Sequence, residues 1–155
     1  GNAMMPRESG FTYLGALFLA AVLAIVAARG VEVTATKEQR AREAELLWVG
    51  SAYRDAIRQY YVNTPGYQKR YPPDLKALLL DERPTRPTRP LRKLYRDPIT
   101  GNEQWGIIES PDAGVMGVYS LSTRKPIKVD GFTVESLGFT TAKTYQDWKF
   151  SFEPN

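Results

Sequence analysis

The feature that most constrains this chain is an uncharged apolar run, Phe11 to Ala28, near its amino terminus. As an α-helix the run would be ~27 Å long at ~1.5 Å per residue, close to the ~30 Å hydrocarbon core of a bilayer. It is rich in the helix formers Ala and Leu, contains no Pro, and is followed by Arg29, whose long side chain can reach a membrane surface. We therefore predict a transmembrane helix over residues 11–29.

Two other interpretations of this run are open. A helix buried inside a globular domain would need apolar surroundings on every side. A cleaved secretory signal is the stronger rival, because Arg7 supplies a basic region and Val26 and Ala28 fit a small-residue cleavage site. The run nevertheless exceeds the ~7–15 apolar residues of such signals. Basic residues on both sides of the run leave its orientation undetermined.

Residues 30–62 favour a soluble continuation of the same helix. Good helix formers fill residues 37–45, and Glu38 and Arg42 are spaced for an i,i+4 pair. An apolar stripe at 3-4-3-4 spacing follows, formed by Leu46, Val49, Tyr53, Ala56 and Tyr60. We expect this stripe to pack on the chain's own sheet, because it covers barely two heptads of a coiled coil. Turn residues at 63–66 end the helix.

Residues 63–104 predict a loop region with a short helix at 75–80. The segment from Glu82 to Pro90 has Pro at every third position, which favours an extended polyproline conformation. Residues 69–96 carry nine basic and three acidic side chains, whereas residues 97–155 carry five basic and eight acidic ones. A solvated loop and a site for an anionic partner are both consistent with this polarity. The candidate partner-binding residues are Arg83, Arg86, Arg89, Arg92 and Lys93.

Residues 105–155 predict a small antiparallel sheet. Strands expected at 105–108 and 115–121 flank turn residues at 111–114, and period-two alternation indicates a last strand at 147–152. We expect residues 122–143 to be irregular. A long helix, membrane-spanning in its first half and packed on three or four antiparallel strands, defines an α+β fold.

The amino terminus resembles the processing signature of type IV pilins and type II secretion pseudopilins. The signature consists of a short polar leader that ends in Gly10, followed by Phe11, Thr12 and the apolar helix. The leader, residues 1–10, opens with what looks like an expression-tag remnant. Further similarity to the major pseudopilin is carried by Leu94-Tyr95-Arg96-Asp97-Pro98, Trp105-Gly106 and Val118-Tyr119-Ser120.

The resemblance implies that a prepilin peptidase cleaves after Gly10 and methylates Phe11. It also implies a single-pass protein of the bacterial inner membrane with its domain in the periplasm. The implied partners are other pseudopilin or pilin subunits and the inner-membrane assembly platform, and the candidate assembly residues are Phe11, Gly15, Leu46, Val49 and Tyr53.

Gly15 departs from the family, which usually has Glu at this fifth mature position. A carboxylate inside a bilayer needs a partner, and the family pairs it with the amino terminus of a neighbouring subunit. Three interpretations of the missing carboxylate are open: the chain is a subunit at a filament tip, the packing of the filament is relaxed, or the small glycine permits close approach of two helices.

Major pseudopilins also hold calcium in an Asp-rich loop before the last strand. Here that stretch has only the widely spaced Asp130, Glu135 and Asp147, whereas calcium needs six to eight oxygen ligands. We therefore predict no metal and no cofactor.

Composition excludes several other function classes. The chain has no Cys and no His, which excludes disulfides, thiolate zinc sites and His-dependent triads. Glu109 and Asp112 are close in sequence but flank an expected turn, so we predict no enzyme activity. The basic segment lacks interleaved stacking aromatics, so we expect no nucleic acid. The predicted function is a pilin-like structural subunit. The alternatives are a periplasmic binding or adaptor domain, either membrane-anchored or exported on a cleaved signal, and an anchored enzyme of unknown chemistry.

Overall fold

The computed structural model describes residues 5–155, and side chains from residue 12 onward. The chain divides into two compact units, Gly1–Glu38 and Gln39–Asn155. The helix α1 (Met5–Val62) contributes to both and begins before the predicted residue 11. The tag remnant lies outside the described residues, as do the side chains of Gly10 and Phe11.

In the first unit, the described residues 5–38 all belong to α1. Its apolar segment meets the length and composition of a membrane-spanning helix, and none of that segment is buried within the chain. Large side chains such as Phe18 and Val26 are exposed, at 74% and 63%. This is the pattern expected of a segment that lipid or other protein covers, because apolar side chains in water cost free energy in proportion to their exposed area.

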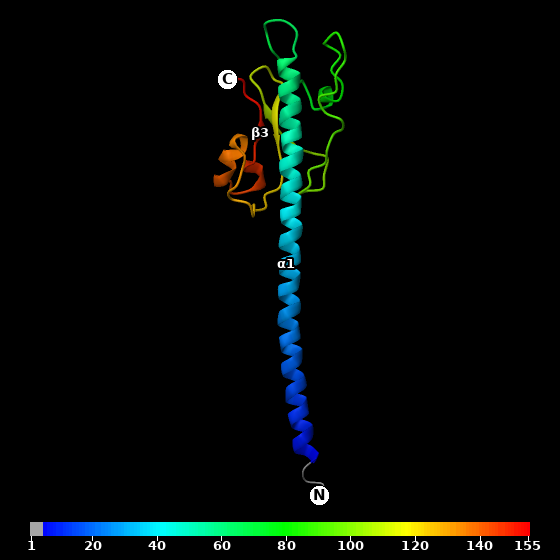
Figure 1. Ribbon diagram of the computed structural model, residues 1–155, viewed down its shortest axis with the longest axis vertical. Coiled ribbons are helices and arrows are strands. Elements are labelled where there is room, and N and C mark those ends of the chain that lie inside the picture. Colours follow the sequence, from blue (N-terminus) through cyan, green and yellow to red (C-terminus); the bar gives the residue numbers. More distant parts are fainter. Residues whose placement is uncertain (1–4) are drawn as a thin grey trace. The chain divides into compact units, whose positions relative to one another are not determined.

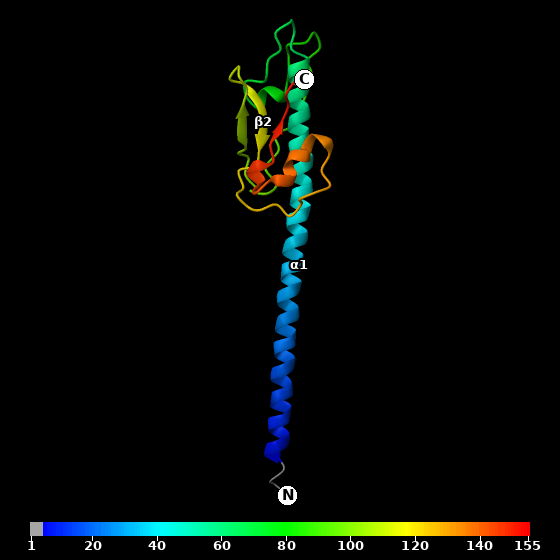
Figure 2. The ribbon, with the colours of Figure 1, turned by 90° about the vertical axis from the view of Figure 1, so that its left-hand side faces the viewer.

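The second unit is an α+β domain, which confirms the predicted fold class. Its sheet has the order β1-β2-β3 and is antiparallel throughout (Figure 2). The strands are β1 (Gly106–Glu109), β2 (Val115–Tyr119) and β3 (Phe150–Ser151). The last strand is shorter than predicted, because a 3₁₀ helix, η4 (Tyr145–Asp147), precedes it.

The core lies between the sheet and the α1 residues of the same unit. Leu46 and Tyr53 are fully buried, and Val49 is 2% exposed. Gly50 permits close approach to the sheet, because a Cβ there would lie 2.5 Å from the ring of Phe150. The predicted packing of the apolar stripe on the chain's own sheet is thus confirmed.

Three predictions about the loops need correction. Residues 122–143, expected to be irregular, contain the 3₁₀ helix η3 (Val134–Thr141). The segment from Glu82 to Pro90 is not one extended strand, because Asp81 and Thr88 pair through both backbone hydrogen bonds and the chain turns back between them. The short helix expected at 75–80 is a single 3₁₀ turn, η2 (Lys76–Leu78).

Candidate functional site

Gly15, a candidate assembly residue, lies on the exposed apolar part of α1. Apart from the adjacent residues and the backbone of the helix itself, no described atom lies within 4 Å of the position that a Cβ on Gly15 would take. The position can therefore accept a side chain in this chain alone, and any requirement for glycine would come from a neighbouring molecule.

Leu46, Val49 and Tyr53 lie elsewhere, in the core of the second unit. The Tyr53 hydroxyl donates to the Tyr95 carbonyl at 3.2 Å and accepts the Tyr95 N–H at 2.9 Å, and burial raises the pKa of Tyr53. These three side chains present no surface to another subunit. Their contribution to assembly would be indirect, through the shape of the domain.

The candidate basic residues divide into two groups, and Arg83 belongs to its own domain. Its guanidinium pairs with the buried Asp81 at 2.8 Å, donates to the Tyr60 carbonyl at 2.7 Å, and lies 3.5 Å from the centre of the Tyr60 ring. A further bond reaches the Thr64 hydroxyl at 2.9 Å. The side-chain hydrogen bond from Arg83 lowers the pKa of Asp81 below its ordinary value. Arg83 therefore holds the start of the 82–90 segment against the carboxyl-terminal end of α1.

The other basic residues face solvent. Arg89 is exposed, although it donates to the carbonyl oxygens of Leu79 and Arg92 at 3.3 and 2.7 Å. The Lys93 ammonium lies 5.1 Å from the centre of the Tyr95 ring. Arg86 and Arg92 are also exposed. Any anionic partner would meet this second group.

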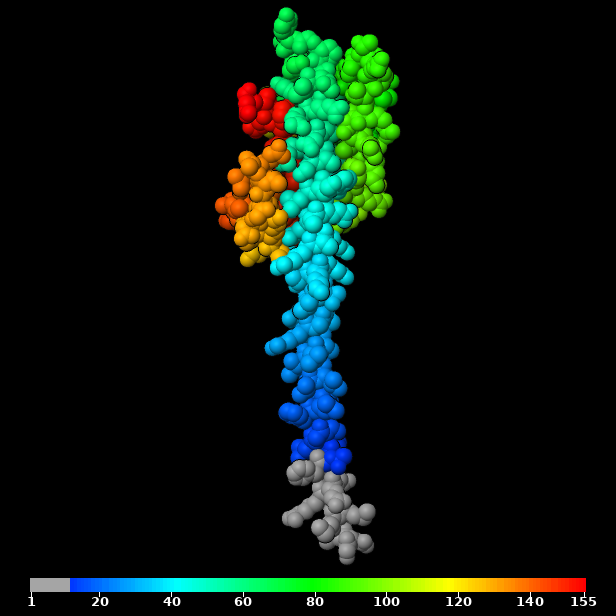
Figure 3. Space-filling view, viewed as in Figure 1, coloured from blue at the N-terminus to red at the C-terminus, as the bar shows by residue number. Residues whose placement is uncertain are grey.

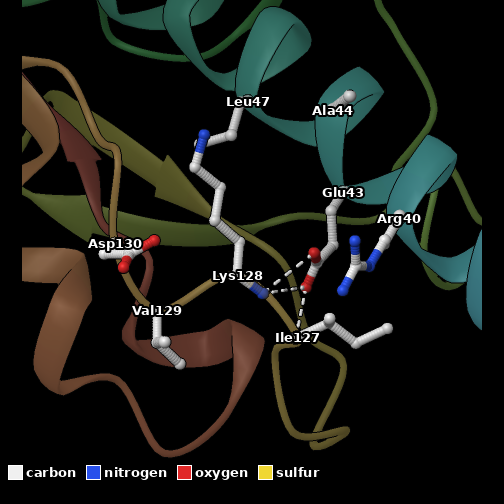
Figure 4. A pocket seen from close by; sticks show the side chains of 8 residues that line it. All are labelled: Arg40, Glu43, Ala44, Leu47, Ile127, Lys128, Val129 and Asp130. Atoms are coloured by element: carbon white, nitrogen blue, oxygen red, sulfur yellow. Dashed lines mark hydrogen bonds between the residues drawn. The ribbon is translucent and has the colours of Figure 1, made fainter.

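A buried carboxylate that the sequence analysis did not single out fixes the loop after β2. Glu43 is 2% exposed and accepts the N–H groups of Ile127 at 2.6 Å and Lys128 at 3.2 Å (Figure 4). The Tyr145 hydroxyl donates to the same carboxylate at 2.7 Å. Burial and this carboxylate both raise the pKa of Tyr145, so the hydroxyl remains a donor at neutral pH.

Gln39, one turn before Glu43, extends this contact. Its amide nitrogen donates to the Lys125 carbonyl at 3.0 Å and to the Tyr145 hydroxyl at 2.9 Å, and its oxygen accepts from Arg124 at 3.1 Å. We call Gln39, Glu43 and Tyr145 the loop clamp. Three polar side chains thus hold residues 124–128 against α1.

A groove of about 580 Å³ lies beside the loop clamp. Its apolar lining comes from Ala44, Leu47, Ile127 and Val129, and its charged lining from Arg40, Glu43, Lys128 and Asp130 (Figure 4). The groove is open and lies entirely within the second unit. No arrangement of nucleophile and base accompanies it.

Two of the three acidic residues in the stretch where major pseudopilins hold calcium make other contacts here. Glu135 pairs with Arg54 at 2.9 Å, and Asp147 accepts the N–H groups of Lys143 and Thr144. Those backbone hydrogen bonds lower the pKa of Asp147. Within the described part of the chain, no group of three or more acidic residues is placed to hold a metal ion.

Glu109 and Asp112, the acidic residues on either side of the predicted turn, have different surroundings. Asp112 accepts the Ser110 hydroxyl and the Gly114 N–H inside the β1–β2 turn, and the Ser110 bond lowers the pKa of Asp112. Glu109 is exposed on β1. This arrangement stabilises a turn.

Comparisons with protein-family models, with curated proteins and with solved structures find no match to this chain.

Proposed function

We propose that this chain is a pilin-like (pseudopilin) subunit of a type II secretion system or a type IV pilus-like filament. One observation carries the proposal: α1 supplies both an apolar segment with no cover inside the chain and the core stripe of an α+β domain. In such an assembly, the uncovered segment is anchored in the inner membrane before assembly and packs against the same segment of neighbouring subunits afterwards, while the domain lies in the periplasm.

The leader motif supports the same proposal. Gly10 followed by Phe11 and Thr12, directly before the apolar segment, is the cleavage pattern of this class. The proposed partners are sister subunits, the prepilin peptidase and the inner-membrane assembly platform. The proposal includes no reaction of the chain itself. Glu43 at the groove and Asp112 at the turn are engaged in structural hydrogen bonds.

Amino-terminal sequencing of the protein from native membranes tests the proposal. We expect an N-methylated Phe11 as the first residue. A terminus at Arg29 would indicate an exported domain that has lost a signal peptide. An intact leader in cells that contain an active prepilin peptidase would favour an anchored binding or adaptor domain.

The absence of a carboxylate at residue 15 leads to a prediction about where the subunit assembles. We expect Gly15→Glu to increase incorporation along the filament body, because the new carboxylate would meet the positive amino terminus of the next subunit inside the apolar core. The measurement is the amount of the subunit in sheared filaments, with Gly15→Gln as the uncharged control. Equal incorporation of the native, Glu and Gln forms would remove the basis for a tip-specific role.

A further inference from the structure

One side of α1 is uncovered along the domain. Residues 63–96 flank the helix on one side and residues 122–147 on the other, and α1 is visible between them in the space-filling view (Figures 1 and 3). The two flanks differ in character. One carries the groove beside the loop clamp, and the other carries an exposed aromatic side chain.

The groove flank combines an apolar lining with unpaired positive charge. Ala44, Leu47, Ile127 and Val129 supply the apolar surface, and Val129 is 57% exposed. At its rim, Arg40 is exposed and has no ion-pair partner within residues 12–155, and the Lys128 ammonium has only a ring contact, 5.2 Å from the centre of Phe132. The Glu43 carboxylate below is already saturated by its three donors.

The opposite flank presents a rigidly supported indole. Trp48 is 61% exposed, and its ring packs edge-on against Tyr95 with 5.4 Å between ring centres. The backbone of Tyr95 is itself held by the Tyr53 hydroxyl and by the Trp105 indole N–H, so its position is fixed from the core. Glu45, three residues before Trp48, is exposed and has no ion-pair partner within the side chains that the structure describes. Residues three apart are neighbours on a helix surface, so the indole and the carboxylate form one protrusion.

We propose that Trp48 and Glu45 of one copy dock into the groove of a second copy of this chain. The indole would cover the apolar lining, and the carboxylate would meet Arg40 and Lys128 at the rim. Exposed aromatic residues of this kind are enriched among the residues that dominate binding energy, and a cation beside an indole face adds to the attraction. The rim of the groove has Arg40 and Lys128 against the single carboxylate of Asp130, and this net positive charge is complementary to Glu45. The opposite charges of Glu45 and the rim favour this contact with a second copy over one with a neutral or basic partner.

The two flanks lie on opposite sides of α1, and this decides the symmetry of the contact. A protrusion and a groove on different faces of one molecule pair head-to-tail, so each added copy leaves a free groove and a free protrusion at the two ends. Such a contact does not pair two copies into a closed dimer, and it forms a filament or a ring according to the rotation between successive copies. The inference rests on the proposed function and adds to it a contact between domains, separate from the packing of the apolar segments.

Disulfide cross-linking of the full chain in native membranes tests the contact, and the absence of native Cys makes the background clean. The variant Glu45→Cys with Lys128→Cys should give a ladder of multimers on oxidation. The matched control, Glu45→Cys with Glu109→Cys, keeps the first cysteine and moves the second to exposed β1, and it should give none. A single band at the dimer size would indicate a closed contact and overturn the inference.

Charge reversal is a second test that does not depend on cysteines. Glu45→Lys and Lys128→Glu should each reduce multimer formation, and Trp48→Ala should reduce it at least about tenfold. The double variant Glu45→Lys with Lys128→Glu should restore it, because the reversed charges face each other across the contact. If the double variant assembles no better than the single ones, the proposed contact is wrong.

A cysteine in the apolar segment distinguishes failure of this inference from failure of the proposed function. Ala20→Cys should give a cross-linked dimer wherever the apolar helices of two subunits lie together. A dimer through residue 20 without a ladder through residues 45 and 128 would reject the domain contact and leave the filament proposal standing. Loss of both would count against both.

Discussion

The arginines of the proline-rich segment differ in their contacts, and Asp81 is the reason. Arg83, Arg86 and Arg89 are equivalent in sequence, at three-residue intervals between prolines. Only Arg83 turns inward, because the buried Asp81 two residues earlier accepts its guanidinium and its backbone N–H. The closeness of Asp81 in sequence was a signal for an Asp81–Arg83 pair. The burial of Asp81, however, depends on its backbone pairing with Thr88, which the proline pattern does not predict.

The Asp81–Arg83 pair leads to a pH-dependent stability. The hydrogen bond from Arg83 holds the pKa of Asp81 below its ordinary 3.8, so the pair stabilises the folded domain fully above that value and less as pH falls through the folded-state pKa. We expect Asp81→Asn to lower the free energy of unfolding by roughly 3 kcal/mol at neutral pH. The difference from the native chain should shrink near about pH 3.

Urea unfolding in detergent, followed by circular dichroism at both pH values, measures this difference. Glu109→Gln, which alters an exposed carboxylate with no hydrogen bond or ion pair in the described structure, is the control. A destabilisation of the same size at both pH values would show that the ionised pair is not its source.

At the scale of elements, local patterns were sufficient for α1 and the α+β class but not for residues 122–149. Helix periodicity and strand alternation are short-range signals, and they place the core stripe correctly. The loop clamp instead joins residues more than eighty positions apart, from Glu43 to Ile127 and Tyr145. A partial signal was present, because continuing the 3-4 spacing of the stripe backward from Leu46 reaches Glu43 and then Gln39.

The loop clamp predicts a local effect of Glu43→Gln. The amide retains one acceptor oxygen but brings an NH₂ group against N–H donors, so we expect a loss of about 2 kcal/mol of stability. Hydrogen exchange should accelerate at the amides of residues 124–128, while β1 and β2 keep their protection. Glu45→Gln, the exposed neighbour, should change neither quantity. Uniform acceleration across the sheet would contradict a local role.

The same loop should be insensitive to chelators. Glu135 and Asp147 are engaged by Arg54 and by backbone N–H groups, and the hydrogen bonds of the loop clamp hold residues 124–128. We therefore expect EGTA to leave the thermal unfolding midpoint of the full chain in detergent unchanged. A fall of several degrees that added calcium reverses would show that a metal contributes to this loop.

At the scale of the whole molecule, the chain divides into a unit that contains the apolar helical segment and a folded α+β unit. Among the side chains of residues 12–155, every buried apolar one lies between Leu46 and Phe150, within the second unit. No side chain of residues 12–38 is buried within the chain, and most helices in proteins gain their stability from packing of this kind. The uninterrupted apolar run is the strongest compositional signal in the chain, and it predicts a span that ends at residue 29, whereas the second compact unit begins at Gln39.

This division predicts that a fragment of residues 36–155 folds alone in water. It retains Gln39, the loop clamp and the full apolar stripe, so its circular dichroism spectrum should show helix and strand and a cooperative thermal transition. A fragment that starts after Glu43 serves as the comparison and should melt at a lower temperature. If the longer fragment is unfolded, the domain depends on the apolar segment for more than attachment.

The three tryptophans lie in different surroundings: Trp48 faces solvent, whereas Trp105 and Trp148 are buried, with Trp148 stacked on Phe139 at 5.5 Å. Tryptophan fluorescence can therefore report on two separate properties of the chain. Emission from the two enclosed indoles follows the integrity of the domain. Quenching of the outward indole by a water-soluble iodide or acrylamide follows whether another molecule covers it, so polymerisation can be timed without a label.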